Sequence, residues 1–407
     1  MDFTVLEIKI QQFIDDNSNA DVSKLALQKN PFPETDWTLI LQQLAAKQKA
    51  KTKLPTWFEA KNILYPSKIS VEQTSSEKTA EYKASLVFGE SLIDLTGGFG
   101  VDDFYFSKTV KNVVHCEVNT ELSKIVSHNF EQLNVKNVKC FADDSSEVLQ
   151  KLNQKFDWIY IDPSRRNDAK GKVFMLKDCL PNVPELLDFY FSFSDNIMIK
   201  TAPILDISAG ISELKNIAQI YIVALENEVK ELLFILNRNY ESTIEIKTIN
   251  LLKNKQETFQ FQLNSEVKNT NYSVPKKYLF EPNAAIMKSG GFDEIAIQFG
   301  LEKLHQHSHL YTSDEIMDFP GRVFEIKNTL EYNKANMKSF LENQKANITT
   351  RNFPETVENI RKKWKITDGG NLYCFFTTDL NNNKIVYFFS LKIRSKTAYL
   401  TSIKSVI

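Results

Sequence analysis

The sequence predicts a doubly wound α/β domain that follows a small helical domain and precedes α+β modules. Three observations support this fold class. Residues up to about 66 show helical periodicity, short apolar runs alternate with helical stretches from about 90 to 238, and period-two alternation begins past 240. The chain has 407 residues, of which 42% are hydrophobic and 25% are charged. We expect several domains from this length, with boundaries at 1–70, 71–240, 241–325 and 326–407.

Residues 1–70 are expected to form a small helical domain. Apolar residues recur at spacings of three and four, as in Ile10, Phe13 and Ile14 and again in Trp37, Ile40, Leu41 and Leu44. Prolines at 31, 33, 55 and 66 interrupt the pattern, which favours several short helices over one long helix.

Residues 71–240 are expected to form a mostly parallel sheet with crossover helices. The apolar runs that predict strands are 91–95, 112–117, 138–141, 158–162, 197–200, 220–225 and 232–236. The stretches that predict helices are 120–133, 145–154 and 184–191. The last two strands lie too close in sequence for a helix between them, so we expect an antiparallel pair at one edge of the sheet.

The remaining sequence favours α+β modules. Residues 243–252 and 258–263 alternate in period two around a short polar turn, which predicts a hairpin. A further unit is expected from 278 to about 321. After it we expect a helix at 355–364 and strands at 372–377 and 385–393.

Composition excludes several classes of protein. No apolar run approaches the roughly 20 residues that span a bilayer, and the first 16 residues are amphipathic and acidic, so we expect neither membrane insertion nor secretion. The four cysteines are far apart and form no paired spacing, which argues against a disulfide framework and against a zinc site (Cys116, Cys140, Cys179 and Cys374). These features favour a reducing cytoplasm and no bound metal.

Charge is distributed unevenly along the chain. The net charge is -1, but residues 331–407 contain 13 Lys/Arg against 6 Asp/Glu. Two interpretations remain open at this point. The segment is either a nucleic-acid-binding appendage or a small domain with a solvated basic face.

A glycine-rich loop follows the first strand of the α/β domain. Its sequence is Asp94-Leu-Thr-Gly-Gly-Phe-Gly100. In a doubly wound sheet ligands bind outside the carboxyl ends of the strands, and glycines let backbone approach a ligand closely. The loop alone predicts a nucleotide-like ligand, with Asp94, Thr96, Gly97, Gly98, Phe99 and Gly100 as the binding candidates.

Carboxylates also end the next three strands. Glu117 follows the second strand, about 20 residues past the loop, where it could accept the hydroxyls of a ribose. Asp143 follows the third strand and could accept an adenine amine proton, and Asp162 follows the fourth. The alternative is that these are solvent-exposed turn acids. A strand end needs no acid, so four in succession favour a binding site.

Together these residues resemble the class I S-adenosylmethionine methyltransferases. The loop resembles the first motif of that superfamily, in a variant with the first glycine replaced. The resemblance implies a Rossmann-like fold that binds S-adenosyl-L-methionine. It also implies that Asp94, Gly98 and Gly100 frame the methionine, Glu117 the ribose and Asp143 the adenine.

Three other segments indicate a narrower group of proteins. They are residues 72–83, 278–288 and 347–353. They resemble bacterial methyltransferase-like proteins with a ferredoxin-like insert and a C-terminal THUMP-like domain. That resemblance implies a ribosomal or transfer RNA substrate, by analogy at the level of domains. Arg351 and Phe353 lie in the last segment, which mixes cations with aromatics, and are candidates for substrate binding.

The fourth strand is followed by Asp162-Pro-Ser-Arg-Arg166. Methyltransferases that act on amino groups often have Asp/Asn-Pro-Pro-aromatic here, so Asp162 and Pro163 match and Ser164, Arg165 and Arg166 depart from that pattern. We expect Asp162 to orient or deprotonate the nucleophile, and Arg165 and Arg166 to hold a phosphate or base. The alternative is that the two arginines only pair with carboxylates of the protein. The motif does not identify which atom of the substrate is methylated.

Other residues suggest further sites or functions. His305, His307 and His309 alternate, which could bring three imidazoles together, but the segment is expected to be a surface loop. Asp102 could cap a helix or contact the cofactor, and capping is the expected role. Competing functions are a nicotinamide-dependent oxidoreductase, disfavoured because GxGxxG is absent, and a non-catalytic RNA-binding protein on a relic fold. The oligomeric state is not predicted.

Overall fold

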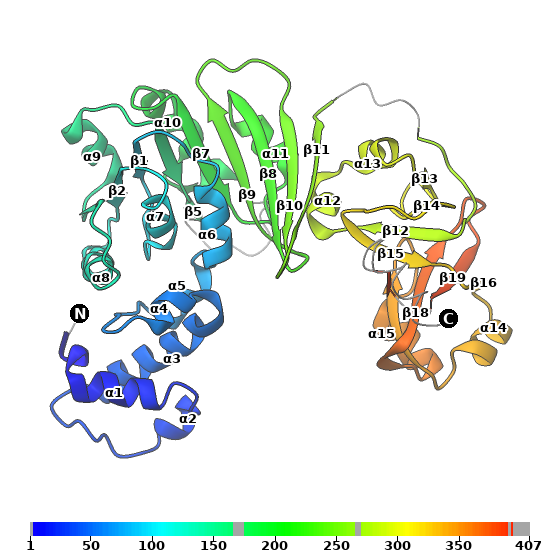
Figure 1. The fold of residues 1–407 in the computed structure, drawn as a ribbon, viewed down its shortest axis with the longest axis horizontal. Helices are drawn as coiled ribbons and strands as arrows, with labels where there is room; N and C mark the ends of the chain where they lie inside the picture. The colour runs from blue at the N-terminus through cyan, green and yellow to red at the C-terminus, as the bar shows by residue number, and fades with distance from the viewer. Residues whose placement is uncertain (1–2, 166–174, 265–269, 390–391, 394–407) are drawn as a thin grey trace. The chain divides into compact units, whose positions relative to one another are not determined.

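The computed structural model describes residues 3–165, 175–264, 270–389 and 392–393. The chain divides into two compact units, one of residues 1–220 and 231–242 and one of residues 221–230 and 243–407. Each can be followed by colour in Figure 1. Within the described residues, no helix combines the length and apolar character needed to cross a bilayer. The four-domain division at 70, 240 and 325 stays a prediction.

The first unit begins with short helices, as the proline spacing predicts. They are η1 (Phe3–Leu6), α1 (Ile8–Asp16), α2 (Val22–Leu25), α3 (Trp37–Lys53), α4 (Pro55–Glu59) and α5 (Lys68–Gln73). Ile10, Ile14, Ile40 and Leu44 are buried between them, which is the set of apolar positions that the spacing indicates. Asp36 caps α3 by accepting from the Thr38 N–H.

The rest of the unit is the predicted α/β domain. Its strands are β1 (Ser91–Asp94), β2 (Asn112–Cys116), β3 (Val138–Phe141), β4 (Trp158–Ile161), β7 (Asn196–Thr201), β8 (Ile217–Leu225) and β9 (Glu228–Asn237). Its helices are α6 (Glu77–Ala84), α7 (Val101–Phe106), α8 (Thr120–Gln132), α9 (Ser145–Leu152), α10 (Val183–Phe191) and α11 (Ile207–Glu213). A 3-10 turn, η2 (Leu176–Asp178), and the short pair β5 (Ser164–Arg165) and β6 (Cys179–Leu180) complete it.

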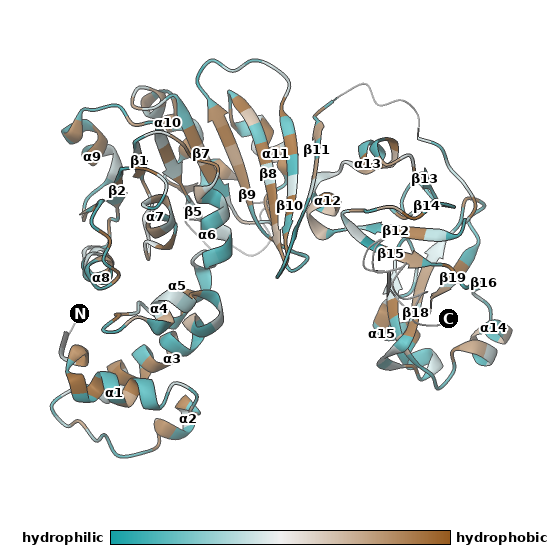
Figure 2. Cartoon of the chain, in the orientation of Figure 1, coloured by the Kyte–Doolittle hydropathy of each residue, from teal (hydrophilic) through white to brown (hydrophobic). Residues whose placement is uncertain are grey.

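Strand order positions the site. β2 and β4 both pair with β1 in parallel, β3 extends the sheet beyond β2, and β7 extends it beyond β4. The strand order therefore reverses at β1, and ligands of such sheets bind outside the carboxyl ends of the strands there. Strands β7 and β9 are largely apolar in Figure 2, and all four residues of β4 are buried, consistent with burial on both faces of the sheet.

The prediction of an edge pair is wrong in one respect. β8 and β9 are neighbours in the sheet, as expected, and β9 also pairs antiparallel with β7. The order of the sheet is β11-β10-β8-β9-β7-β4-β1-β2-β3, so the hairpin of β10 (Glu245–Leu251) and β11 (Gln256–Gln262) lies beyond β8. Without the hairpin, β8 would be an edge strand with unpaired backbone N–H and C=O groups. In the sheet, β10 lies beside β8 and covers that edge.

The second unit contains two further sheets. One has the order β13-β14-β12-β15-β20, from strands β12 (Tyr278–Pro282), β13 (Glu302–Lys303), β14 (Tyr311–Ser313), β15 (Gly321–Glu325) and β20 (Lys392–Ile393). The other has the order β16-β19-β18-β17, from β16 (Asn328–Glu331), β17 (Lys345–Thr350), β18 (Thr367–Thr378) and β19 (Lys384–Phe389). The helices are α12 (Ala284–Ser289), α13 (Phe292–Gln298), α14 (Lys334–Phe340) and α15 (Val357–Trp364). Trp364 is buried in the core of the second sheet.

Candidate active site and family

The glycine-rich loop joins β1 to α7 and is tied down at its start. The Thr96 N–H donates to Asp94 Oδ1 at 2.7 Å, and the Gly97 N–H donates to the Cys116 carbonyl of β2 at 2.8 Å. Gly100 has a left-handed φ of 74°, and a Cβ there would lie 2.8 Å from Phe130 and Val126. The backbone path of the loop therefore depends on its glycines.

Phe99 differs from its neighbours in the loop. Its side chain is 5% exposed, with its ring 6.3 Å from those of both Trp57 and Tyr65. The Phe99 side chain is therefore closed to a ligand. Trp57 of α4 and Tyr65, between α4 and α5, pack against the loop through it.

Glu117 follows β2 and turns its carboxylate toward the loop. Oε2 accepts from the Gly98 N–H at 3.1 Å, and Oε1 accepts from the Asn119 N–H at 2.7 Å. Asn119 in turn caps α8. A carboxylate at this strand end is thus fixed against the backbone of the glycine loop, 19 residues away in sequence.

Asp143 and its neighbour Asp144 have separate roles. Asp144 caps α9 by accepting from the Ser146 and Glu147 N–H groups. Asp143 has no partner among the described residues and is partly exposed. Helix capping therefore explains Asp144 and leaves Asp143 available to a ligand.

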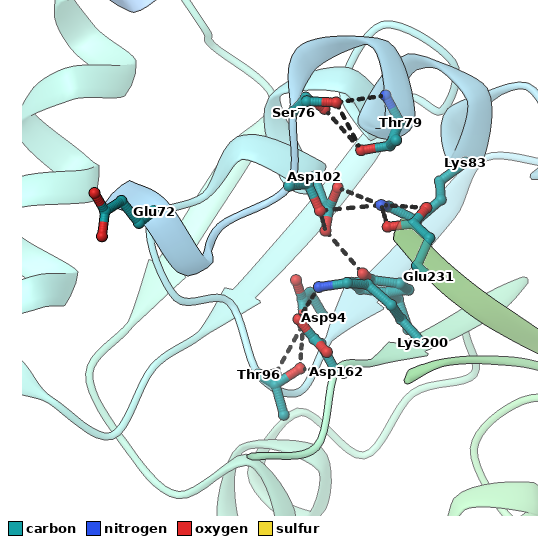
Figure 3. Close-up of polar contacts among 12 residues, drawn as sticks. Glu72, Ser76, Thr79, Lys83, Asp94, Thr96, Asp102, Asp162, Lys200 and Glu231 are labelled. Atoms are coloured by element: carbon teal, nitrogen blue, oxygen red, sulfur yellow. Dashed lines mark hydrogen bonds and ion pairs between the residues drawn. The ribbon is translucent and has the colours of Figure 1, made fainter. Parts of the chain in front are cut away.

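Asp162 follows β4 and is held from two sides. Its N–H donates to Thr96 Oγ1 at 2.6 Å, which joins the fourth strand end to the glycine loop. Its Oδ2 pairs with Lys200 Nζ at the end of β7 (Figure 3). Pro163 is buried and Ser164 is exposed in β5, where it pairs with Leu180. The side chain of Arg165 and the whole of Arg166 lie outside the described residues.

A buried polar network lies beside Asp162. Lys83 of α6 is fully buried and donates to both oxygens of Glu231 on β9, at 2.9 and 2.7 Å. It also lies 3.2 Å from Asp102 Oδ1. Asp102 Oδ2 accepts from Ser75 Oγ at 2.9 Å and from the Tyr160 hydroxyl at 2.7 Å. The prediction that Asp102 caps a helix is wrong, because the N-cap of α7 is Gly100 and the Asp102 side chain pairs with Lys83.

The network changes proton affinities. Burial raises the pKa of Glu231, which Lys83 and Lys200 partly oppose. Burial alone would raise the pKa of Asp102, but Lys83 and Lys200 hold it below its usual value. The buried Lys200 has a raised pKa, because Asp162, Asp102 and Glu231 outweigh the effect of burial. Lys200 therefore serves as a fixed cation.

A second buried cluster lies under the loop. His115 Nδ1 is 2.6 Å from Asp103 Oδ2, and both side chains are fully buried. Burial, and next the neighbouring Asp103, raise the pKa of Asp94 well above its usual range. Burial and Asp102 do the same for Asp103, which hydrogen-bonds to Asp94. Burial lowers the pKa of His115. The interior under the loop thus favours protonated carboxyls and a neutral imidazole.

The other candidates lie in the second unit. Arg351 Nη2 pairs with Glu281 Oε1 at 2.8 Å, and Arg322 binds the other oxygen of that carboxylate. Phe353 packs on Tyr332 and Phe376 with ring centroids 5.0 and 5.5 Å away. The contacts of both residues are intramolecular, so their role in substrate binding stays a prediction. Of the three histidines, His305 and His307 lie together with ring centroids 5.5 Å apart, whereas His309 stacks on Phe292 at a centroid distance of 3.6 Å.

Three family profiles match the chain. One described as conserved hypothetical protein 95 matches residues 64–177, a ferredoxin-like domain matches 278–320 and a THUMP-like domain matches 321–388. A candidate methyltransferase of Porphyromonas gingivalis W83 superposes with a TM-score of 0.84 and 29% identity, over 94% of this chain and 98% of that one. Over most of its length the chain is therefore similar to a methyltransferase-like protein, and it contains ferredoxin-like and THUMP-like domains.

Other solved structures resemble part of this methyltransferase-like chain. TrmK of M. capricolum, crystallised with S-adenosylhomocysteine, matches at 13% identity and a TM-score of 0.32, over 40% of this chain and 69% of that one. An rRNA methylase of Streptococcus thermophilus matches at 14% identity and a TM-score of 0.29, over 40% and 94%. No curated protein matches the chain in sequence.

The methyltransferase-like domain also contains residues that sequence reasoning missed. Lys83 lies in the segment 72–83 that suggested the family, but its partner Glu231 is 148 residues away. Lys200 ends a predicted strand. The one sequence signal for a role of this residue is a basic side chain at the end of an apolar run. Val118 is 70% exposed beside Glu117, an apolar side chain open to solvent at a strand end.

Proposed function

We propose that the chain transfers a methyl group from S-adenosyl-L-methionine to a base in RNA. The observation that carries this proposal is the hydrogen bond from the Gly98 N–H to Glu117 Oε2. It brings a carboxylate suited to ribose hydroxyls against the loop suited to the methionine, at the edge where the four acidic strand ends meet.

The residues present fit this cofactor. A Cβ at Gly98 would meet only the Thr96 carbonyl, at 3.7 Å, so the loop faces open space there. Each oxygen of Glu117 accepts one backbone N–H and keeps a lone pair for a ribose hydroxyl. Asp143 is unpartnered within the described residues and could accept from the adenine amine, and Val118 could contact the adenine ring. S-adenosyl-L-methionine would supply the methyl group as a sulfonium.

The chain's own part in the reaction is positioning. Displacement at the methyl carbon needs a nucleophile held in line, about 3 Å away. Asp162 lies one hydrogen bond from the glycine loop through Thr96, so it is placed to orient the acceptor group relative to the cofactor. Ser164 follows on the exposed strand β5, and we propose that Arg165 and Arg166 hold a phosphate or a base.

Domain composition and charge support RNA as the substrate. The THUMP-like domain lies in the basic C-terminal segment, where residues 331–407 have 13 Lys/Arg against 6 Asp/Glu. On α15 and its C-cap, Lys362 and Lys365 are exposed. Arg361 and Lys363 pair with Asp368 and Glu355. Lys362 and Lys365 are therefore the lysines of this helix that we expect to contact RNA phosphates.

The cofactor assignment is tested by calorimetric titration with S-adenosylhomocysteine. Wild-type protein should bind it and should not bind NADH, and Glu117→Ala should weaken binding by at least about tenfold, since two charge-assisted hydrogen bonds are lost. Glu121→Ala, an exposed carboxylate four residues on in α8, is the matched control and should bind as wild type. Binding of NADH but not S-adenosylhomocysteine would favour an oxidoreductase. Binding of neither ligand would favour a non-catalytic protein on a relic fold.

RNA binding is tested separately by its salt dependence. Lys362→Glu with Lys365→Glu should weaken binding to bulk RNA and lower the slope of log affinity against log salt by about 1 to 2, for two phosphate contacts. Lys9→Glu with Lys111→Glu, at exposed lysines of the first unit, is the control. An unchanged slope in the first variant would remove α15 from the RNA surface.

A further inference from the structure

The second unit contains a cavity of about 390 Å³ that includes none of the candidate active-site residues. Its walls come from three places in the chain. They are the start of the β11 strand with the turn before it (255–258), Phe299 at the end of α13, and the segment 316–321 with Val323. Pockets that bind small ligands have volumes of about 300 to 1,000 Å³, so this cavity has room for one small group.

A buried carboxylate, Glu257, joins the walls of the cavity. Its side chain is 9% exposed. Oε2 accepts from Asn250 Nδ2 of β10 at 3.1 Å and from Nδ2 of Asn283, the N-cap of α12, at 3.2 Å. Gln298 of α13 also donates to the Gln260 carbonyl of β11, at 2.8 Å. The hairpin and the ferredoxin-like domain are therefore held together around the cavity by contacts within the protein.

The other oxygen of Glu257 is less strongly engaged. Oε1 pairs with Lys255 Nζ at 2.9 Å, and the Lys255 side chain is 55% exposed. Because an ion pair that reaches solvent is weak, a donor on a ligand can replace this lysine. Asp318 also lines the cavity, is exposed, and has no partner within the described residues. Two carboxylates thus line a cavity in which Lys255 is the one basic residue among those described.

Most of the remaining lining is apolar and includes a ring that is held in place. Phe319 is 7% exposed, and its ring packs edge-on against Phe280 and Phe299 with centroids 5.4 and 5.3 Å away. Phe299 is partly exposed and lines the cavity with Ile316 and Met317. Unstacked bases of single-stranded RNA pack on phenylalanine rings that are presented in this way.

These walls select a flat apolar group that carries hydrogen-bond donors. Carboxylate oxygens only accept hydrogen bonds, so the ligand has to donate. A phosphate does not fit, because the two carboxylates would repel it. The exocyclic amino groups of cytosine and adenine each offer two N–H donors at the edge of a flat ring. RNA, the proposed substrate, presents such edges where its bases are unpaired.

We propose that this cavity binds one unstacked nucleobase of the RNA, with its ring against Phe299 and its exocyclic amino group donating to Glu257 and Asp318. The inference rests on RNA as the substrate, as proposed above. No residue of the candidate active site lines the cavity, so the base bound here is a recognition base and not the base that is methylated. The site would make the chain prefer RNA with cytosine or adenine at one unpaired position.

The stacking contact is tested by fluorescence anisotropy of the full chain with labelled single-stranded RNA hexamers of cytidine or of uridine. Cytosine and uracil have the same ring size, but uracil has a carbonyl in place of the amino group. Wild-type protein should bind the cytidine hexamer about tenfold more tightly. Phe299→Ala should weaken binding of both hexamers by about tenfold, because a base loses its stacking surface. Phe88→Ala, at an exposed phenylalanine of the first unit, is the control and should bind as wild type.

The amino-group contact is tested by Asp318→Asn. The preference for cytidine should fall to about threefold or less, because one of the two acceptors is lost. Glu315→Gln removes the same charge from an exposed position nearby that does not line the cavity, and it should keep the preference. Both variants and Phe299→Ala should keep the wild-type slope of log affinity against log salt, since no phosphate contact is removed. Asp318 is exposed, so its variant still decides the matter if Phe299→Ala does not fold.

Several results would overturn the proposal. They are equal binding or no binding of the two hexamers by the wild type, an unchanged cytidine preference in Asp318→Asn, and a changed salt slope in Phe299→Ala. Free cytidine that competes at the same concentration as the hexamer would overturn RNA as the source of the base.

Failure of this inference is distinguishable from failure of the proposed function. Binding of S-adenosylhomocysteine should be unchanged in Phe299→Ala and Asp318→Asn, because neither residue belongs to the candidate active site. A wild type that prefers cytidine but does not methylate RNA would refute the proposed function alone. A wild type that methylates RNA without any preference for cytidine would refute the base-binding cavity alone.

Discussion

The His115 ring lies directly beneath the backbone of Gly97, so close that a Cβ at residue 97 would come within 2.1 Å of the imidazole Cε1. His115 is fully buried and is itself held by Asp103 at 2.6 Å. The second strand of the sheet therefore supports the glycine loop through one side chain, and the loop requires a residue without a Cβ at that point.

Replacing Gly97 by alanine should destabilise the protein by about 3 kcal/mol, since the new methyl overlaps ring atoms that have nowhere to move. It should also weaken binding of S-adenosylhomocysteine. Gly300→Ala is the control: its φ of 60° carries backbone strain, but nothing lies within 4 Å of the added Cβ, so a cost of about 1 kcal/mol is expected. Urea unfolding of the full chain measures both. Equal losses of unfolding free energy in the two variants would contradict this expectation, because they would show that the His115 ring moves aside easily.

The carboxyls under the loop should make stability depend on pH. Burial raises the pKa of Asp94 and of Asp103, so the folded state holds protons that the unfolded chain releases above about pH 4. Their contribution to stability is full below that pH and is lost as pH rises through the folded-state values. Asp103→Asn cannot ionise, so its stability relative to wild type should increase between pH 5 and pH 8.

His115 contributes with the opposite sign. Its lowered pKa means that the unfolded chain binds a proton more readily, so this contribution is present above about pH 6.5 and is lost as pH falls below it. Urea unfolding of Asp103→Asn and wild type at matched pH values cancels much of the His115 effect. A stability difference that does not vary with pH would contradict the account of the carboxyl pair.

Lys83 should be critical for folding. Replacing it by methionine leaves Glu231 and Asp102 buried without their cation, and loss of one partner from a buried pair costs about 3 to 5 kcal/mol. Lys124→Met removes an exposed partner of Glu121 and should cost less than about 1 kcal/mol. Thermal denaturation compares the two. Glu231→Gln added to Lys83→Met should recover part of the loss, and a further loss instead would refute the pairing.

Arg351 should matter for stability. With Arg322 it holds Glu281, which is 2% exposed, so Arg351→Met leaves that carboxylate half-paired and should cost about 3 kcal/mol. Arg361→Met, which breaks a pair with the exposed Asp368, is the control and should cost under about 1 kcal/mol. Urea unfolding measures the loss, and RNA affinity measured in parallel tests the predicted role in substrate binding. A stable Arg351→Met with weakened RNA binding would favour that role.

Local patterns were enough to predict the α/β domain. The four strands that carry the site residues were predicted to within one residue at each end, because apolar runs bounded by turns and helices mark buried parallel strands (β1, β2, β3 and β4). Asp94, Glu117, Asp143 and Asp162 follow from the same pattern, since parallel strands bring their carboxyl ends to one edge.

Partners distant in sequence could not be predicted. The position of Asp102 just after a glycine predicts a helix cap. Its ion pair with Lys83 forms only in the folded chain and leaves no local signal in the sequence. Arg351 reads as a basic surface residue, and its partner Glu281 is 70 residues away. Burial decides such pairs, and a single sequence shows the charge without the burial.

The central claim is tested most directly by mass spectrometry of ribosomal and transfer RNA nucleosides from cells with and without the gene. We expect one methylated nucleoside to be missing without the gene, to return with the wild-type chain, and to stay missing with Asp162→Ala. An unchanged set of methylated nucleosides, or full restoration by Asp162→Ala, would contradict the account.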